Sequence, residues 1–123
     1  MADIIWLTEP LPHTYEAAES YLTLITPKAA HTVLRLRQFA GTFGFKAKDI
    51  LRAAGLAVLP EHNDGVTIKR TAIDSGEALS PVLLARDDRN GRLHIVDGYH
   101  RVCTLYTKHE STVVQCRIVS LVY

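Results

Sequence analysis

Apolar residues in the first half of the chain recur at helical spacing. Ala18, Leu22 and Ile25 lie three or four positions apart, which places them on one face of a helix. The same period returns three more times before residue 78. Helices are predicted over residues 14–25, 27–39 and 46–54, and from Asp64 or Thr67 to near Gly76. This part of the chain is therefore expected to be mainly helical.

Residues at the ends of these segments support the boundaries. Thr14 suits the N-terminal cap of the first helix, Pro27 the first turn of the second, and Gly55 the C-terminal end of the third. The second helix is expected to bury Ala30, Val33, Leu34 and Leu36. Segment 41–44 contains two glycines and is expected to be a flexible connection.

The period changes from helical to alternating at Ser80. Strands are predicted over residues 82–85, 93–96 and 113–119, and a helix over residues 100–108. The turn chemistry of residues 87–91 joins the first two strands as a β-hairpin. In the last strand Val114, Cys116 and Ile118 share one face, and polar residues between them share the other. A small mixed sheet is therefore expected.

These elements predict one α+β domain over residues 1–123, with a mainly helical part (1–78) and a hairpin, helix and strand unit (79–123). With 47% apolar residues the chain can bury a core without disulfides, so Cys103 and Cys116 are expected to be core thiols. No apolar run approaches the roughly 20 residues that cross a bilayer, and the N-terminus lacks a secretory pattern. No membrane association and a cytoplasmic location are expected.

The net charge of +1 conceals an uneven distribution. Residues 1–26 carry four acids and no base, residues 27–70 carry eight bases against three acids, and the remainder carries six of each. A basic middle segment can attract a nucleotide or a nucleic-acid backbone, but solvated helix faces often have the same composition. Both interpretations stay open at this point.

The turn between the second strand and the helix that follows it is suited to an anion. The first backbone N–H groups of a helix have no partners within it, and they lie at the positive end of the helix dipole. Gly98 permits a positive φ and a close approach of a ligand. His100 and Arg101 are cations in the first turn, where the dipole disfavours them by roughly 0.3 to 1 kcal/mol. A bound phosphate would reverse that sign.

Several roles are open to the side chains of this turn. Arg101 can donate two hydrogen bonds to a phosphate, and His100 can donate one or exchange a proton with a substrate. Asp97 can cap the helix, hold Arg101 in place, or help position Mg²⁺ through the phosphates. Asp97 and His100 are thus the candidate catalytic residues. The alternative is that Asp97 is only a cap and that His100 and Arg101 are surface residues.

Residues 79–119 closely resemble the core of the ParB N-terminal domain and sulfiredoxin superfamily. The resemblance is carried by Ser80-Pro81-Val82-Leu83-Leu84, a hairpin, Ile95-Val96-Asp97-Gly98-Tyr99-His100-Arg101, a helix and a last strand. The Asp-Gly-x-His-Arg turn is also similar to that of small bacterial ParB-like proteins. In the superfamily this turn holds nucleotide phosphates: ATP in sulfiredoxin, CTP in ParB and ADP in the free serine kinase.

The resemblance implies a set of nucleotide-binding residues. These are Gly98, His100 and Arg101, with Tyr99 in the same turn, and Lys69 and Arg70 on the helix before Ser80, where relatives often add phosphate contacts. The implied ligand is a nucleotide such as ATP, ADP or CTP, with Mg²⁺. A serine-kinase-like activity would also need an N-terminal carboxylate, for which Glu16 and Glu19 are candidates. Their alternative role is to compensate the dipole of the first helix.

Departures from the superfamily pattern narrow the function. Sulfiredoxin has its catalytic cysteine where this chain has Tyr99, so sulfinic-acid reduction is not expected. Cys103 lies one helical turn further on and is expected to be half buried. The chain ends at Tyr123 without a helix-turn-helix domain, so chromosome partitioning is not expected either.

Two functions from different classes follow. The first is a nucleotide-binding protein with phosphotransferase or nucleotide-hydrolysing activity at residues 97–101. The second is a non-catalytic module that binds nucleic acid or a protein through the basic residues 28–70, and a homodimer is compatible with both. A nuclease is disfavoured because no cluster of carboxylates is available for two metals. A metal shared by His94 and His100 is also disfavoured, because His94 is expected to lie on the hairpin surface.

Overall fold

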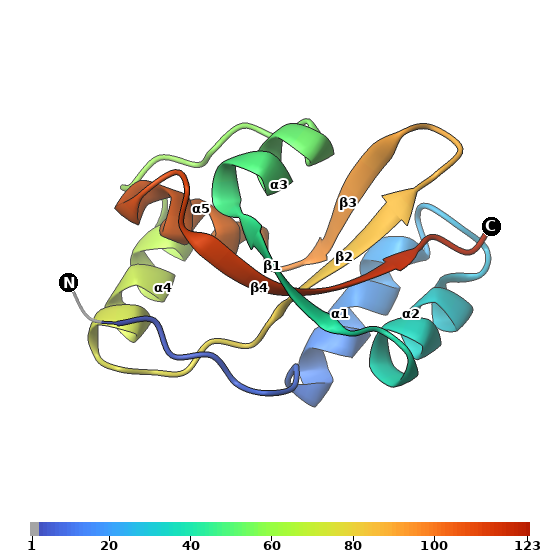
Figure 1. Cartoon of the computed structure of the whole chain (residues 1–123), viewed down its shortest axis with the longest axis horizontal. Coiled ribbons are helices and arrows are strands. Elements are labelled where there is room, and N and C mark those ends of the chain that lie inside the picture. The colour runs from blue at the N-terminus through green and yellow to red at the C-terminus, as the bar shows by residue number, and fades with distance from the viewer. Residues whose placement is uncertain (1–2) are drawn as a thin grey trace.

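The computed structural model describes residues 3–123 and has helices on both sides of one sheet (Figure 1). The helices are α1 (Pro12–Leu22), α2 (Ala29–Gln38), α3 (Ala47–Ala54), α4 (Asp64–Asp74) and α5 (Tyr99–Lys108). Helices α1 and α2 pack on one face, α3 and α5 pack on the other, and α4 packs against α5. Within residues 3–123, none of the helices has the length and apolarity needed to cross a bilayer.

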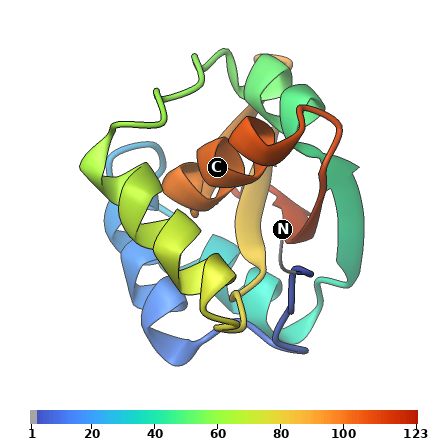
Figure 2. The same ribbon diagram turned by 90° about the vertical axis from the view of Figure 1, so that its left-hand side faces the viewer.

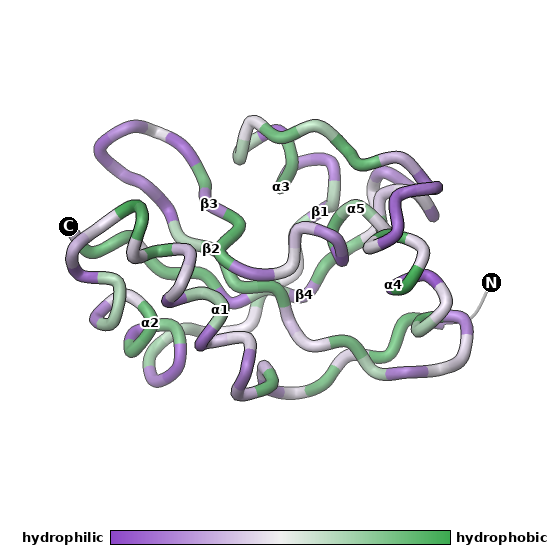
Figure 3. Tube along the Cα trace, turned by 180° about the vertical axis from the view of Figure 1, so that it is seen from behind, coloured by the Kyte–Doolittle hydropathy of each residue, from purple (hydrophilic) through white to green (hydrophobic). Residues whose placement is uncertain are grey.

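The sheet is mixed and has four strands. They are β1 (Thr42–Lys46), β2 (Val82–Asp87), β3 (Arg92–Asp97) and β4 (Val113–Ser120), in the order β1-β4-β2-β3. Strands β2 and β3 form the expected antiparallel hairpin, whose turn is hydrophilic (Figure 3). Strand β4 is parallel to β2 and antiparallel to β1. The α+β prediction is therefore confirmed, with the predicted elements found within three residues of their expected ends.

Alternation along the strands divides the interior into two cores. Leu84 and Val114 face α3 and α5, whereas Leu83 and Val96 face α1 and α2. All four side chains are buried. Because β2 is covered on both faces, it has the nearly continuous apolar sequence typical of a central strand.

In the segment 41–44, which was expected to be flexible, residues 42–44 instead form the beginning of β1, so that prediction was wrong. Phe43 pairs with Cys116 and Phe45 with Val114, more than 65 positions away in the sequence. A local pattern cannot show such a partner. Gly44 is required for packing rather than flexibility, because a Cβ there would lie 2.6 Å from Cγ1 of Val113.

The predicted face of the second helix was also partly wrong. Ala29, Thr32, Val33 and Leu36 are buried, whereas Ala30 and Leu34 point to solvent. The hydroxyl of Thr32 explains the difference, because it accepts a hydrogen bond from the backbone N–H of Val122 at 3.1 Å. A polar residue therefore occupies a position that the hydrophobic pattern assigned to solvent.

His94 is buried rather than on the hairpin surface, which corrects a second expectation. Its side chain is only 5% exposed because α1 packs over β3. Nδ1 lies 2.8 Å from the Tyr21 hydroxyl, and Nε2 lies 3.8 Å from Oδ2 of Asp87. Burial, assisted by the nearby charge of Arg92, lowers the pKa of His94. The environment between Tyr21 and Asp87 therefore favours the neutral imidazole.

This environment makes stability depend on pH. Because the folded-state pKa of His94 lies below the unfolded value of about 6.5, protonation favours the unfolded chain. We expect the free energy of unfolding to fall as the pH is lowered from 7.5 to 5.5, and to fall less in His94→Gln. Urea titrations at both pH values measure this, with His31→Gln on exposed α2 as the control. An equal pH dependence in all three proteins would contradict the prediction.

Candidate functional site

The turn between β3 and α5 has the backbone geometry expected of an anion site. Gly98 adopts φ 109° and ψ 20°, a conformation that residues with a Cβ rarely adopt. A Cβ there would also lie 2.7 Å from Nη2 of Arg101 and 2.9 Å from Cγ2 of Val82. No side chain caps α5. The first N–H groups of this helix, from Tyr99 onward, are therefore not used by a capping side chain.

Arg101 lies beneath this turn and not on its surface. Its side chain is buried, with the residue only 6% exposed. Nη2 lies 2.5 Å from Oδ2 of Asp97, and Nη1 donates to the backbone carbonyl of Ser80 at 3.0 Å. Nε is buried and has no hydrogen-bond partner among the described residues. Of the three roles open to Asp97, the structure shows the one in which it holds Arg101.

His100 is exposed and lies against the first turn of α4. A Cβ on Gly65 would be 2.3 Å from Cδ2 of His100, so the close approach of the ring depends on a glycine at that position. Further along, Thr104 donates to the carbonyl of Val66 at 3.3 Å. These contacts, and the ion pair of 3.3 Å between Lys108 and Asp74, follow the same order on both helices. The N-terminal ends of helices α4 and α5 therefore lie together (Figure 2).

The two adjacent N-terminal ends differ in one respect. In α4 the side chain of Asn63 accepts hydrogen bonds from Gly65 and Val66, at 3.0 and 3.3 Å. Helix α5 has no such cap, because its N-cap residue is Gly98, which has no side chain, and the carboxylate of Asp97 before it is bonded to Arg101. The positive ends of two dipoles thus meet where the N–H groups of α5 have no side-chain acceptor.

The structure does not connect the other predicted basic residues to this turn. Arg70, which is half buried, lies 3.5 Å from the exposed Glu61, and an ion pair this close to solvent contributes little to stability. Lys69 is half buried, one helical turn after Gly65. Within residues 3–123, no hydrogen bond or ion pair joins Lys69 or Arg70 to residues 97–101, so their role stays a prediction.

Glu16 and Glu19 lie far from the turn in the fold. They line a cleft of about 290 Å³ between α1 and α2, together with Arg37. Those helices cover the face of the sheet opposite to α5, so neither carboxylate lies beside His100. The sequence could not distinguish this arrangement, because the sign of the charge does not fix the side of the sheet.

The basic residues between 28 and 70 do not form a single stripe. They are divided among α2 on one face of the sheet, strand β1 at the edge of the sheet, and α3 and α4 on the other side. This division favours the interpretation that they solvate separate helix faces. The nucleic-acid or protein-binding alternative stays a prediction.

Tyr99 and Cys103 have structural contacts. The Tyr99 hydroxyl donates to the carbonyl of Ala57 at 2.5 Å and so fixes the segment after α3. Cys103 is fully buried, rather than half buried as expected, and its Sγ accepts from the backbone N–H of Leu59 at 3.4 Å. Burial raises the pKa of the Cys103 thiol, which disfavours the thiolate needed by a nucleophile.

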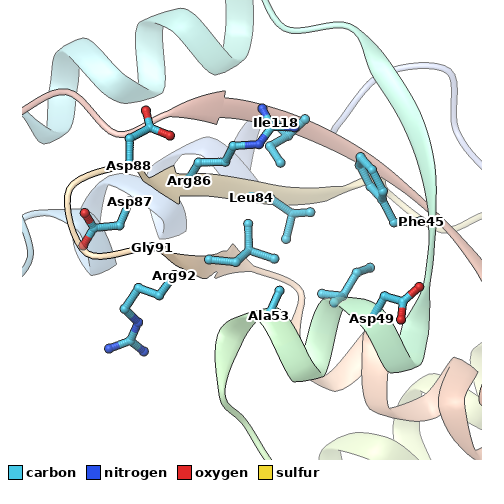
Figure 4. A pocket seen from close by; sticks show the side chains of 12 residues that line it. Phe45, Asp49, Ala53, Leu84, Arg86, Asp87, Asp88, Gly91, Arg92 and Ile118 are labelled. Atoms are coloured by element: carbon cyan, nitrogen blue, oxygen red, sulfur yellow. The ribbon is translucent and has the colours of Figure 1, made fainter.

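A groove that the sequence did not indicate lies at the other end of the hairpin (Figure 4). It has a volume of about 470 Å³, with apolar side chains such as Leu84 and Ile118 in its floor and Arg86, Arg92 and Asp88 at its rim. It exists because α3, only eight residues long, leaves part of the sheet uncovered. The groove adjoins Arg92, whereas Gly98 follows the opposite end of β3, about 20 Å along the strand. Its rim carries both signs of charge and specifies no ligand class.

Metal ligands are not clustered in the part of the chain that the structure describes. No three His, Cys, Asp or Glu side chains among residues 3–123 lie close enough to hold an ion. His94 faces α1 and His100 faces α4, so the two imidazoles do not converge.

Comparison with known proteins does not indicate a function, so a functional proposal depends on the geometry of the site. No protein-family model, curated protein or solved structure matches the chain. The superfamily resemblance therefore stays a prediction.

Proposed function

We propose that the chain is a nucleotide-binding protein of the ParB and sulfiredoxin type that holds phosphates at the N-terminal end of α5. The observation that carries this proposal is the uncapped first turn of α5, which follows a glycine at φ 109° and adjoins the N-terminal end of α4. The carboxylate that could cap it is bonded to Arg101 instead. An external anion is the natural acceptor for these N–H groups.

Each residue of the turn then has a distinct part in holding the phosphates. The backbone N–H groups of the first turn donate to phosphate oxygens, and the exposed imidazole of His100 donates a further hydrogen bond or exchanges a proton. Arg101 holds the turn in shape through Asp97 and Ser80, and its charge is balanced by the carboxylate of Asp97. Such a site favours phosphoryl transfer or nucleotide hydrolysis, in which positioning and charge stabilisation dominate.

The residues present fit Mg²⁺ only through the phosphates of a nucleotide. Asp97 is the single carboxylate among residues 97–101, and its Oδ2 is engaged by Arg101. Mg²⁺ commonly uses one or two carboxylates together with substrate phosphates. Asp97 would supply at most its other oxygen, and the ion would add charge neutralisation for the phosphates.

Calorimetric titration with ATP, ADP, CTP and GTP, each with Mg²⁺, tests the proposal. We expect at least one nucleotide to bind the parent protein at millimolar or lower concentration, and His100→Ala to weaken that binding about tenfold. A hydrogen bond to a charged group is worth about 1.5 to 3 kcal/mol, which is consistent with a change of that size. His100 is chosen over Arg101 because its side chain is exposed, so its loss should not unfold the protein.

Two further variants make this experiment specific. His31→Ala removes an exposed imidazole from α2, on the other side of the sheet, and should leave binding unchanged. Gly65→Ala keeps His100 but displaces its ring from α4, and should weaken binding in the same direction as His100→Ala. The proposal fails if no nucleotide binds the parent, or if His31→Ala reduces affinity as much as His100→Ala.

A further inference from the structure

The two edges of the sheet differ in how they are protected. Strand β3 lies between α1 and α3, and its residues from Leu93 to Val96 are all buried. Every residue of strand β1 is exposed except the half-buried Phe45. Figure 2 shows β1 at the outer margin of the fold, with no element beyond it. The structure therefore covers one edge and leaves the other open.

An open edge with these residues is suited to pairing with another strand. Alternate backbone N–H and C=O groups of an edge strand face outward without a partner in the sheet. Charges and prolines usually discourage pairing at such edges, but β1 has no proline and its only charge is Lys46 at one end. Exposed apolar side chains surround the strand: Phe39 is 73% exposed, Phe43 54% and Val113 50%.

We propose that β1 is a homodimer interface in which two copies pair antiparallel about a twofold axis at Gly44. The sequence Thr42-Phe43-Gly44-Phe45-Lys46 is complementary to itself in this register. Phe43 lies opposite the partner's Phe45, and Thr42 lies opposite the partner's Lys46. An aromatic pair across strands is stabilising, and no like charges are opposed.

The chain on either side of β1 leaves room for this pairing. Before β1 it comes from α2 on one face of the sheet, and after β1 it continues into α3 on the other face. At each end of the paired strands, α2 of one copy and α3 of the other therefore lie on opposite faces of the sheet. Gly44 of each copy has no side chain on the α2 face of the sheet, and the side chain of Val113 in the same copy fills the position that a Cβ would take.

A second copy is favoured over an unrelated peptide because the complementarity lies within the strand itself. A twofold arrangement also closes the edge, since each β1 becomes an interior strand of one eight-stranded sheet. Phe45 lines the groove of about 470 Å³, so its new cross-strand neighbour would stand beside that groove.

Sedimentation equilibrium of the whole chain tests for the dimer. We expect a mass that rises with concentration towards twice the 13.7 kDa of the chain. In Phe43→Lys, the concentration at which half of the protein is dimeric should be at least tenfold higher. Leu34→Lys is the matched control, because Leu34 is a similarly exposed apolar residue on α2, away from the edge. A parent protein that is monomeric up to millimolar concentration would overturn the proposal.

Disulfide trapping tests the register separately. Thr42→Cys and Lys46→Cys place single thiols at exposed positions, and the native Cys103 and Cys116 are buried and should not react. In the proposed register an equal mixture of the two variants forms a cross-linked dimer on mild oxidation. Either variant alone should not, because its thiols are separated by four strand positions, or about 13 Å. Equal cross-linking in all three samples, or none in the mixture, would exclude this register.

Discussion

Replacing Asp97 with alanine is expected to lower the free energy of unfolding by about 3 kcal/mol. The substitution leaves the guanidinium of Arg101 buried without its counter-ion, and breaking a buried ion pair on one side typically costs 3–5 kcal/mol. The lower end applies because the Asp97 side chain is 20% exposed. The carbonyl of Ser80 would then be the only acceptor left to Arg101 among its present partners.

Urea denaturation at neutral pH measures this loss, and the chain offers a matched control. Asp49 and Arg52 form an ion pair at 3.1 Å, but Arg52 is largely exposed. Asp49→Ala should therefore cost less than about 1 kcal/mol. If the two variants lose similar amounts, Arg101 is better solvated than its buried position implies.

The buried position of Arg101 also changes how its role should be tested. From sequence, Arg101 was expected to contact phosphate directly, as its counterparts in the resembling superfamily do. The structure instead gives it two internal partners, so loss of binding in Arg101→Ala would not separate a ligand contact from a disturbed turn. Variants of the exposed His100 keep the two effects apart.

The elements that the sequence predicted well are those specified by neighbouring residues. The β-hairpin is defined by the turn at 87–91, and α5 by its apolar period and the preceding Gly98, so both are found close to their predicted bounds. Strand β1 was missed because its partner β4 lies far along the chain. The burial of His94 was missed for the same reason, since α1 is brought over β3 only by the tertiary fold.

In the candidate site, too, features set by neighbouring residues were predicted and contacts between distant residues were not. Gly98, the uncapped helix and the acidic residue before it belong to one short segment, and the backbone geometry expected there is present. The contact between His100 and Gly65 joins residues 35 positions apart, and no periodicity indicates it. A glycine in the first turn of a predicted helix, where it lowers helix propensity, was the available signal for such a close approach.

Replacing Gly98 with alanine is expected to destabilise the protein by about 3 kcal/mol and to abolish the proposed nucleotide binding. A left-handed conformation costs a residue with a Cβ about 1–2 kcal/mol. The new methyl group would also overlap the guanidinium of Arg101 and the buried side chain of Val82, and overpacking of this kind costs about 1–3 kcal/mol. Neither neighbour can move freely, because Arg101 is anchored by Asp97 and Val82 lies in the core.

Gly55→Ala separates the two contributions to this loss. Gly55 also has a positive φ, 66°, but no atom lies within 4 Å of the position of its Cβ. Its substitution should cost only the conformational part, about 1 kcal/mol, in the same urea titration. If Gly98→Ala loses no more than Gly55→Ala, the turn can relax around a methyl group. The methyl group of Gly98→Ala can avoid Arg101 and Val82 only if the first turn of α5 shifts. A Gly98→Ala protein that remained folded and bound nucleotide as tightly as the parent would therefore show that the phosphates lie elsewhere.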